Sequence, residues 1–210
     1  MAMSLASRNH DDDTKAPCAY AVRNAGYRLE WMGPRHHGRA SLQCFIADVF
    51  FKLYGAEVRH FSDTLVGCRG KDGQWLAALG FSLAGEGAVF LEQYLDAPLE
   101  SEIASRTNTN VSRHQIVEVG NLAAIHAGAA RELIICMTRY LHGQGLSWVA
   151  FTATRSLLNS FARLSLNPIV LANADPRRLP DAGKSWGAYY DTKPQVMFGD
   201  IRSGHAQLAE

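Results

Sequence analysis

An apolar run at positions 116–125, IVEVGNLAAI, holds three residues that could do chemistry: Glu118, Gly120 and Asn121. A short apolar run is typical of a strand buried on both faces, and a polar group inside such a strand needs a hydrogen-bond partner or a chemical task. Burial raises the pKa of a carboxyl group toward neutrality, which suits a general base. The run therefore indicates either a buried polar network or an active centre in which Glu118 accepts a proton.

A second carboxylate with the same potential is Glu92. Residues 89–95, VFLEQYL, alternate in the manner of a strand, so we predict that Glu92 is at least partly buried. Either Glu92 or Glu118 would then act as the base, directly or through water. The alternative is that Glu118 is structural and pairs with Arg113 or Arg131.

The position of Asn121 relative to Glu118 depends on the regularity of their strand. In a regular strand, residues three apart point to opposite sides of the sheet, which would separate this pair. A bulge near Gly120 would reverse that parity and bring both side chains to one face.

A strand, a helix, a strand and a helix are predicted around these residues. After the apolar run, residues 126–143 carry apolar side chains at helical spacing, and Gly143 and Gly145 end that helix. Residues 147–154 form the second strand, and a helix follows through residues 157–166. Two strands joined by a crossover helix imply a parallel or mixed sheet with helices packed on it.

The rest of the chain supplies further strands and helices. Its best hairpin signal is the KDG turn, and its longest apolar stripe, which ends at Gly55, is interpreted as core. The predicted elements are a strand at 27–32, a helix ending at 54, hairpin strands at 65–68 and 75–81, a helix at 99–106 and one or two strands within 186–201.

Composition excludes several classes of partner. The 210 residues include 21 Lys and Arg against 20 Asp and Glu, a net charge of +1, with no long basic stretch, so nucleic acid and anionic membrane surfaces are not expected. No segment approaches the roughly 20 apolar residues that span a bilayer, so integral membrane association is not expected. The N-terminus lacks the features of a signal or transit peptide, which favours a cytoplasmic location.

The length of the chain favours a single domain, and its cysteine pattern favours reduced thiols. Residues 1–24 are predicted to be a mobile tail and residues 25–210 a single domain. The four cysteines form no CxxC pair, and Cys44 and Cys136 fall on helical apolar stripes. These two are therefore expected to be reduced core thiols, and no metal is expected.

Several separate blocks give a family resemblance. The unit at 116–166 is similar to the second half of GNAT-type acyltransferases. The blocks FKLYGAEVRHF, FLEQYLDAPLE, VEVGNLA, FTATRSLLNSFARL and WGAYYDTKPQV resemble, in order, the thermostable hemolysin family over residues 39–201. That family is placed beside GNAT enzymes and acyl-homoserine-lactone synthases. The resemblance implies an α/β (α+β) fold, with a GNAT-like mixed, mostly antiparallel sheet flanked by helices and a splayed parallel strand pair.

The resemblance also implies roles for particular residues. The splayed strands would admit the pantetheine arm of a coenzyme A or acyl-phosphopantetheine thioester, and the following helix N-terminus would hold its phosphates. The implied catalytic residues are Glu118, Glu92 and Asn121. The implied cofactor-binding residues are Gly120, Leu122, Ala127, Gly128, Ala129, Ala130, Arg131 and Asn159. The implied substrate-binding residues are Arg113, Trp186, Tyr189 and Tyr190.

The chain departs from its relatives' patterns at three positions. Acyl-homoserine-lactone synthases have an Arg where this chain has Asn121. This difference argues against a homoserine lactone as the product. In place of the GNAT pattern Q/R-x-x-G-x-G/A, Gly128 is followed by two alanines, which keeps room for a phosphate. Phe161 occupies the place of the usual Tyr acid, leaving Tyr189 or Tyr190 as substitutes.

The predicted function is an N-acyltransferase that moves an acyl group from acyl-coenzyme A or an acyl-carrier protein to a small-molecule amine. An acyl-carrier protein or an acyl-activating enzyme is the expected protein partner. Two alternatives remain open: a membrane-lytic hemolysin, as the family's name says, and a non-catalytic module that binds acyl thioesters.

Overall fold

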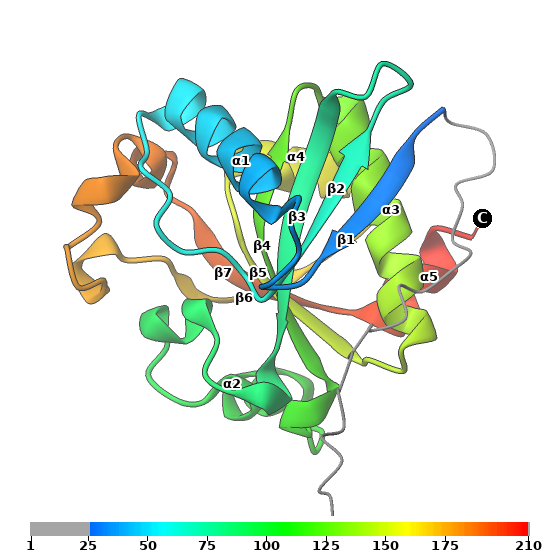
Figure 1. The fold of residues 1–210 in the computed structure, drawn as a ribbon. Coiled ribbons are helices and arrows are strands. Elements are labelled where there is room, and N and C mark those ends of the chain that lie inside the picture. The colour runs from blue at the N-terminus through cyan, green and yellow to red at the C-terminus, as the bar shows by residue number, and fades with distance from the viewer. Residues whose placement is uncertain (1–25, 210) are drawn as a thin grey trace, which may run out of the picture.

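The computed structural model describes residues 26–209, which form a seven-stranded sheet of order β1-β2-β3-β4-β5-β7-β6 (Figure 1). Only β4 and β5 pair in parallel, and the other neighbours pair antiparallel. The strands are β1 Arg28–Met32, β2 Thr64–Arg69, β3 Trp75–Leu83, β4 Ile116–Ala124, β5 Trp148–Ala153, β6 Ile169–Asn173 and β7 Gln195–Asp200. The predicted mixed, mostly antiparallel sheet is confirmed. The predicted tail at 1–24 lies outside the described residues.

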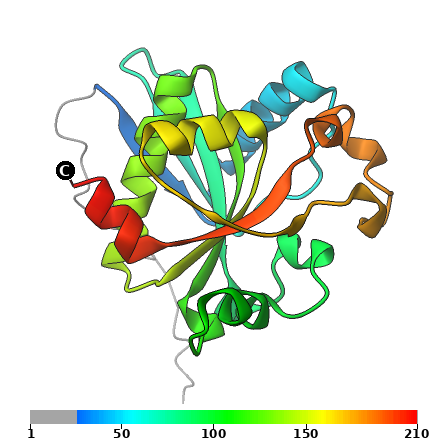
Figure 2. The same cartoon turned by 180° about the vertical axis from the view of Figure 1, so that it is seen from behind.

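Helices cover both faces of the sheet (Figures 1 and 2). The α-helices are α1 Arg39–Tyr54, α2 Leu99–Thr107, α3 Ala127–Gly143, α4 Arg155–Arg163 and α5 Ile201–Gln207. Helix α1 packs Leu42 and Ile46 onto one face, with the cluster that includes α2 beside it. Helix α3 packs Leu133 and Met137 onto the other face, which α4 and α5 also cover. We call these the α1 face and the α3 face.

Glycine geometry explains why the hairpin and the first helix were predictable. Strands β2 and β3 pair around a turn whose Gly73 has φ +79°, and Gly55 ends α1 with φ +66°. Both angles lie in the left-handed region that glycine enters without steric cost.

Strands β4 and β5 separate partway along their length. Their pairing runs from Ile116 opposite Trp148 to Val119 opposite Phe151 and stops there, although both strands continue. On its other edge, β4 follows β3 with a register shift, because two β4 residues lie opposite Leu79. The bulge considered near Gly120 is therefore present, and the splayed pair that the resemblance implied is confirmed.

Asn121 is the residue of the bulge that adopts left-handed geometry, with φ +52°. Gly120 has no positive φ, and a Cβ there would meet only Ser62 Oγ, at 3.7 Å. The sequence pattern therefore located the bulge correctly, but Asn121 supplies the unusual conformation, which Asn tolerates better than most residues.

Four expectations from the sequence were wrong or incomplete. Residues Phe90–Tyr94 form a 3-10 helix, η2, rather than a strand, and their N–H groups point to a side chain instead of a neighbouring strand. Strand β6 was not predicted. Cys44 is exposed, because it faces away from the sheet, whereas Cys136 is buried as expected. The end of the α1 stripe does not pack as core, since Leu53 is 64% exposed.

Candidate active site

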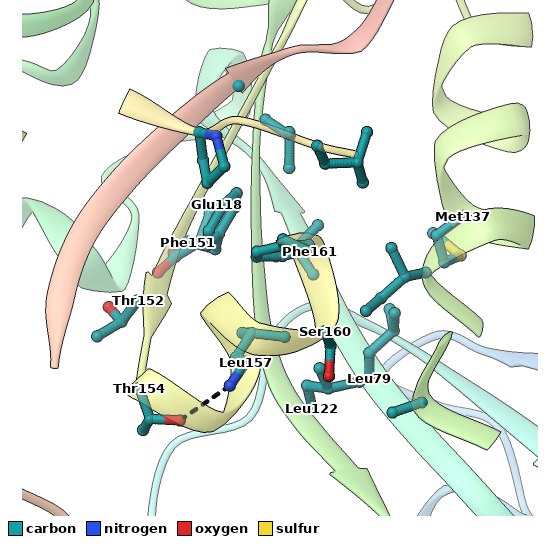
Figure 3. Close-up of a pocket in the computed structure, with 18 of the residues that line it drawn as sticks. Leu79, Glu118, Leu122, Met137, Phe151, Thr152, Thr154, Leu157, Ser160 and Phe161 are labelled. Carbon is teal, nitrogen blue, oxygen red and sulfur yellow. Dashed lines mark hydrogen bonds between the residues drawn. The ribbon is translucent and has the colours of Figure 1, made fainter. Parts of the chain in front are cut away.

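A cavity of about 710 Å³ passes through the sheet at the gap between β4 and β5. Its lining comes from both faces, which is possible only because the two strands separate beyond Val119. On the α3 face the lining is mostly apolar. Figure 3 shows this side, where Met137, Leu157 and Phe161 point toward the space between α3, α4 and the sheet.

Glu118 lies on the α1 face of β4, at the cavity, and is 7% exposed. Its Oε2 accepts the N–H of Phe90 at 2.7 Å, and its Oε1 accepts the N–H of Leu91 at 3.0 Å. Burial raises the pKa of the Glu118 carboxyl to about 7, against the opposing effect of these two N–H groups. Near neutral pH this carboxylate can therefore take up or release a proton.

No Lys or Arg among the described residues forms an ion pair with Glu118. Arg113 donates instead to both oxygens of Glu92, at 2.6 and 2.8 Å, and to Glu100 at 2.7 Å. The interpretation of Glu118 as the structural partner of Arg113 or Arg131 is therefore wrong.

Glu92 is a residue of η2 and does not line the cavity. Besides Arg113, its oxygens accept the N–H groups of Val89 and Leu99, both at 3.1 Å. The hydrogen bond from Arg113 lowers the pKa of Glu92 to about 2, so this carboxylate stays ionised. Its contacts fix residues 89–99, the segment that presents two N–H groups to Glu118.

The Asn121 side chain shares the α1 face with Glu118, as the bulge argument predicted. Its Oδ1 accepts the N–H of Ser62 at 2.9 Å and the Ser62 hydroxyl at 3.2 Å, and its Nδ2 donates to the carbonyl of His60 at 3.1 Å. Arg39 holds the same segment by donating to the Ser62 carbonyl at 2.6 Å. Asn121 thus positions the chain at His60, beside the cavity.

The N-terminus of α3 lies at the cavity, where His126 and Ala127 are lining residues. His126 caps the helix, because its Nδ1 accepts the N–H of Ala129 at 3.0 Å. Residues 127–131 are thus the first turn of α3 and not a loop. A Cβ at Gly128 would lie 3.2 Å from His126 Nδ1, so this glycine leaves room for the cap.

The remaining predicted cofactor residues are distributed unevenly. Gly120, Leu122 and Ala130 line the cavity, whereas Asn159 is exposed on α4 and is not part of the lining. Arg131 also lies outside the lining, and no ion pair joins it to another described residue. Phe161 packs against Phe151, with ring centroids 5.0 Å apart, so an apolar contact replaces the expected phenol.

Of the predicted substrate residues, Trp186 and Tyr189 line the cavity on the α1 face, and Arg113 does not. Tyr190 lies behind them, with its hydroxyl 2.5 Å from that of Tyr94. Burial raises the pKa of Tyr190 to about 12 and that of Tyr94 further, so both phenols stay protonated at neutral pH.

Sequence reasoning missed the other aromatic residues of the α1 face: Phe50, Tyr54, His60 and Phe90. Three of them fall in the block FKLYGAEVRHF or directly before it, which carried a resemblance but no assigned role. Their contribution depends on the packing of η5 (Lys184–Trp186) and η6 (Tyr189–Thr192) against α1, which spans well over a hundred residues of sequence.

Neither a cluster of metal ligands nor a membrane-spanning helix occurs among the described residues. No group of three or more His, Cys, Asp or Glu side chains is arranged to hold a metal ion within residues 26–209. None of the described helices combines the length and apolar character needed to cross a bilayer.

The fold is similar to those of several solved structures. The AHL synthase LasI matches with a TM-score of 0.56 at 9% identity, covering 83% of this chain and 90% of that one. FeeM, an N-acyl amino acid synthase from uncultured soil microbes, matches with a TM-score of 0.59 at 10% identity, covering 86% of this chain and 93% of that one. MesI, a CoA-dependent acyl-homoserine lactone synthase, matches with a TM-score of 0.52 at 11% identity, covering 86% of this chain and 93% of that one.

A putative N-acetyltransferase from Lactobacillus plantarum also matches, with a TM-score of 0.51 at 12% identity, covering 84% of this chain and 99% of that one. These low identities show the fold alone, which is GNAT-like as predicted. No curated protein sequence matches the chain. The model of one sequence family, described as Thermostable hemolysin, matches residues 32–205. The chain therefore belongs to the thermostable hemolysin family.

Proposed function

We propose that this protein is an N-acyltransferase that moves an acyl group from coenzyme A or an acyl-carrier protein to a small amine. One observation carries the proposal: the cavity crosses the sheet where β4 and β5 separate, and a buried carboxylate with a pKa near 7, Glu118, lies at that crossing. Beyond Val119, the backbone of β4 faces this gap without a β5 partner, which leaves room for a thioester between the strands.

The proposed reaction is an attack by the amine nitrogen on the thioester carbonyl carbon. The C–N bond forms, the C–S bond breaks, and Glu118 takes the proton that the amine loses. The thiolate leaves and takes up a proton from solvent or from a phenol of the α1 face. The products are an amide and a free thiol.

Relatives of the same fold support this class of reaction through their names, which describe a CoA-dependent acyl-homoserine lactone synthase and an N-acyl amino acid synthase. The direct test is thiol release from acyl-coenzyme A and from acyl-carrier protein on adding a pool of amines, with mass spectrometry of the product. Release that depends on the amine would support the transferase. If neither donor yields an amide with any amine, the proposal is wrong.

The donor's phosphates are assigned to the N-terminus of α3, where unpaired N–H groups and the helix dipole favour an anion. His126→Asp and His126→Asn test this assignment as a matched pair, because Asp and Asn cap helices about equally well. Only Asp adds a negative charge beside the proposed phosphate. We expect coenzyme A to bind the Asp variant at least tenfold more weakly than the Asn variant, about 1.4 kcal/mol, by calorimetry. If coenzyme A binds both variants with equal affinity, its phosphates do not bind at the N-terminus of α3.

A non-catalytic module that binds acyl thioesters is a second candidate. The observation that favours it is Phe161, which packs on Phe151 at the position where the resemblance to GNAT enzymes implies a Tyr acid. The two candidates agree on donor binding and differ on turnover. Tight binding of acyl-coenzyme A with no thiol release at any amine concentration would select the binding module.

A further inference from the structure

The α1 face of the cavity is an aromatic chamber. We define it by the six rings that surround the space near Glu118: Phe50, Tyr54, Phe90, Tyr94, Trp186 and Tyr189. Trp186 lies at the centre of this set, with its ring centroid 6.1 Å from those of Phe50 and Phe90 and 5.2 Å from that of Tyr189. At these separations the rings pack against one another, so they form one continuous aromatic wall. This wall borders the cavity, where it can meet another ring or a cation.

The chamber is held in shape from outside the cavity. Gly187, with φ +52°, lies so close to α1 that a Cβ there would be 2.1 Å from the carbonyl oxygen of Tyr54. The N–H of Ala188 donates to that same carbonyl at 2.8 Å. Because these contacts join Trp186 and its neighbours to the end of α1, the aromatic walls are in place without a ligand.

The electrostatic character of the chamber is one-sided. None of the described residues that line the cavity is Lys or Arg, and Glu118 is the carboxylate of the chamber. Burial lowers the pKa of His60, which stacks on Phe90 with ring centroids 4.8 Å apart, so this histidine is neutral at pH 7 and above. Arg113, the cation that the sequence suggested for the substrate, is engaged by Glu92 and Glu100.

This arrangement discriminates between classes of amine. A carboxylate on the acceptor would lose its water with no cation to receive it, and it would face Glu118. An ammonium group finds both a carboxylate and ring faces. A polyamine would bring a second ammonium for which the chamber holds no second carboxylate, whereas an uncharged aromatic body matches the walls.

We propose that the acceptor is an arylalkylamine, a primary amine on a short alkyl link to a flat aromatic ring, with no carboxylate. The inference rests on the proposed acyl transfer. The ring lies among Phe50, Phe90 and Trp186, and the nitrogen points to Glu118. Glu118 takes one proton from the bound ammonium, and the free amine nitrogen then attacks the thioester carbonyl carbon. The C–N bond forms as the C–S bond breaks, and the second proton that the nitrogen loses goes to the departing thiolate. This chain would therefore differ from FeeM, whose name describes the synthesis of N-acyl amino acids.

The test compares matched ligands by calorimetry without a donor. Tryptamine should bind at least tenfold more tightly than tryptophan, which adds only a carboxylate, and tryptophan methyl ester should recover most of the affinity. Hexylamine, which lacks the ring, should bind at least tenfold more weakly than tryptamine. If tryptophan or hexylamine binds as tightly as tryptamine, the inference is wrong.

Variants locate the binding site. Trp186→Leu should weaken tryptamine binding at least fivefold. The control is Trp31→Leu, which removes a tryptophan that packs on Tyr140 and does not line the cavity, and it should leave tryptamine affinity unchanged. His60→Arg supplies the missing cation and should raise the affinity for tryptophan relative to tryptamine. If Trp186→Leu and Trp31→Leu lose tryptamine binding equally, tryptamine does not bind in the chamber.

Turnover then separates this inference from the function on which it rests. With octanoyl-coenzyme A or octanoyl-carrier protein as donor, tryptamine should release thiol at least a hundredfold faster than tryptophan at equal low concentration. Selective tryptamine binding with no thiol release would support the chamber assignment and overturn the transferase. Equal thiol release with tryptamine, tryptophan and hexylamine would support the transferase and overturn the arylalkylamine.

Discussion

Two regions on the α1 face each surround a glutamate with two backbone N–H groups, and they give it opposite chemistry. At the cavity, Phe90 and Leu91 donate to Glu118, whose pKa burial raises to about 7. A few residues along the same segment, Val89 and Leu99 donate to Glu92, whose pKa falls to about 2. Two differences matter. Arg113 donates to both oxygens of Glu92 while no described cation pairs with Glu118, and Glu118 is buried while Glu92 is only partly buried.

The comparison shows that backbone hydrogen bonds alone do not decide the protonation of a buried carboxylate. Two N–H groups hold Glu118 in place without fully offsetting its loss of water, so it can still exchange a proton. Adding a guanidinium makes Glu92 a permanently ionised anchor. The anchor in turn positions the N–H groups that contact Glu118, so we propose that Glu92 acts as a support and Glu118 as the base.

Replacing the base should have the largest effect. Glu118→Gln keeps the shape of the side chain but cannot take a proton, so we expect amide formation to fall by roughly a hundredfold or more with donor binding unchanged. Glu92→Gln should cost less, because Glu92 acts only through the segment it holds. Thiol-release kinetics and calorimetry on both variants check this. An inactive Glu92→Gln beside an active Glu118→Gln would exchange the two roles.

Removing the cation should have the next largest effect. Arg113→Gln leaves Glu92 partly buried without its partner, which we expect to destabilise the protein by roughly 2 kcal/mol, below the ~3–5 of a fully buried pair, since Arg113 keeps 25% exposure. Turnover should also fall, because residues 89–99 lose an anchor. Urea unfolding at pH 7 measures the first effect. Unchanged stability would mean that the pair contributes nothing to holding this segment.

How much of this arrangement the sequence could predict depends on the range of the interactions. The bulge was a candidate from the glycine within its strand, and the hairpin followed from its turn residues. The η2 helix did not follow, because five alternating residues fit a strand equally well until Glu118 is known to need two N–H groups. The partner of Glu118 also stayed ambiguous, since the sequence offered both Arg113 and Arg131.

The aromatic chamber was beyond sequence reasoning for the same reason. Trp186 and Tyr189 were candidates for substrate binding, but Phe50 was assigned to the core because its helical spacing matches that of Leu42 and Ile46. Only the packing of residues 183–192 on the end of α1 shows that the apolar stripe divides into core and cavity lining.

Because the pKa values of Glu118 and Glu92 shift in opposite directions, the free energy of unfolding should change with pH in two separate windows. The pKa of Glu118 rises from 4.5 to about 7 on folding, so the folded protein holds this proton more tightly and loses stability as pH rises through that window. Glu92 falls from 4.5 to about 2, so its contribution is present above pH 4.5 and is lost as pH falls through the lower window.

The two Gln variants separate these windows in thermal unfolding. The stability of Glu118→Gln relative to the natural protein should increase from pH 4.5 to 7 and then stay constant. The deficit of Glu92→Gln should shrink as pH falls below 4.5. If both variants deviate in the same window, the two glutamates do not differ in the way the cation argument requires.

The smallest expected effect concerns the bulge that places Asn121 on the same face as Glu118. Asn121→Gly and Asn121→Ala both remove the hydrogen bonds to His60 and Ser62, but only Ala also carries a Cβ at φ +52°. We expect Ala to be less stable than Gly by about 1 kcal/mol, which is the lower end of the cost of left-handed geometry. Both variants should lose some turnover through a looser His60 segment, while donor binding at α3 stays unchanged. Urea unfolding of the two variants measures the difference directly. Equal stability would mean that the bulge relaxes when Asn121 is replaced, and Glu118 would then not depend on it for its position.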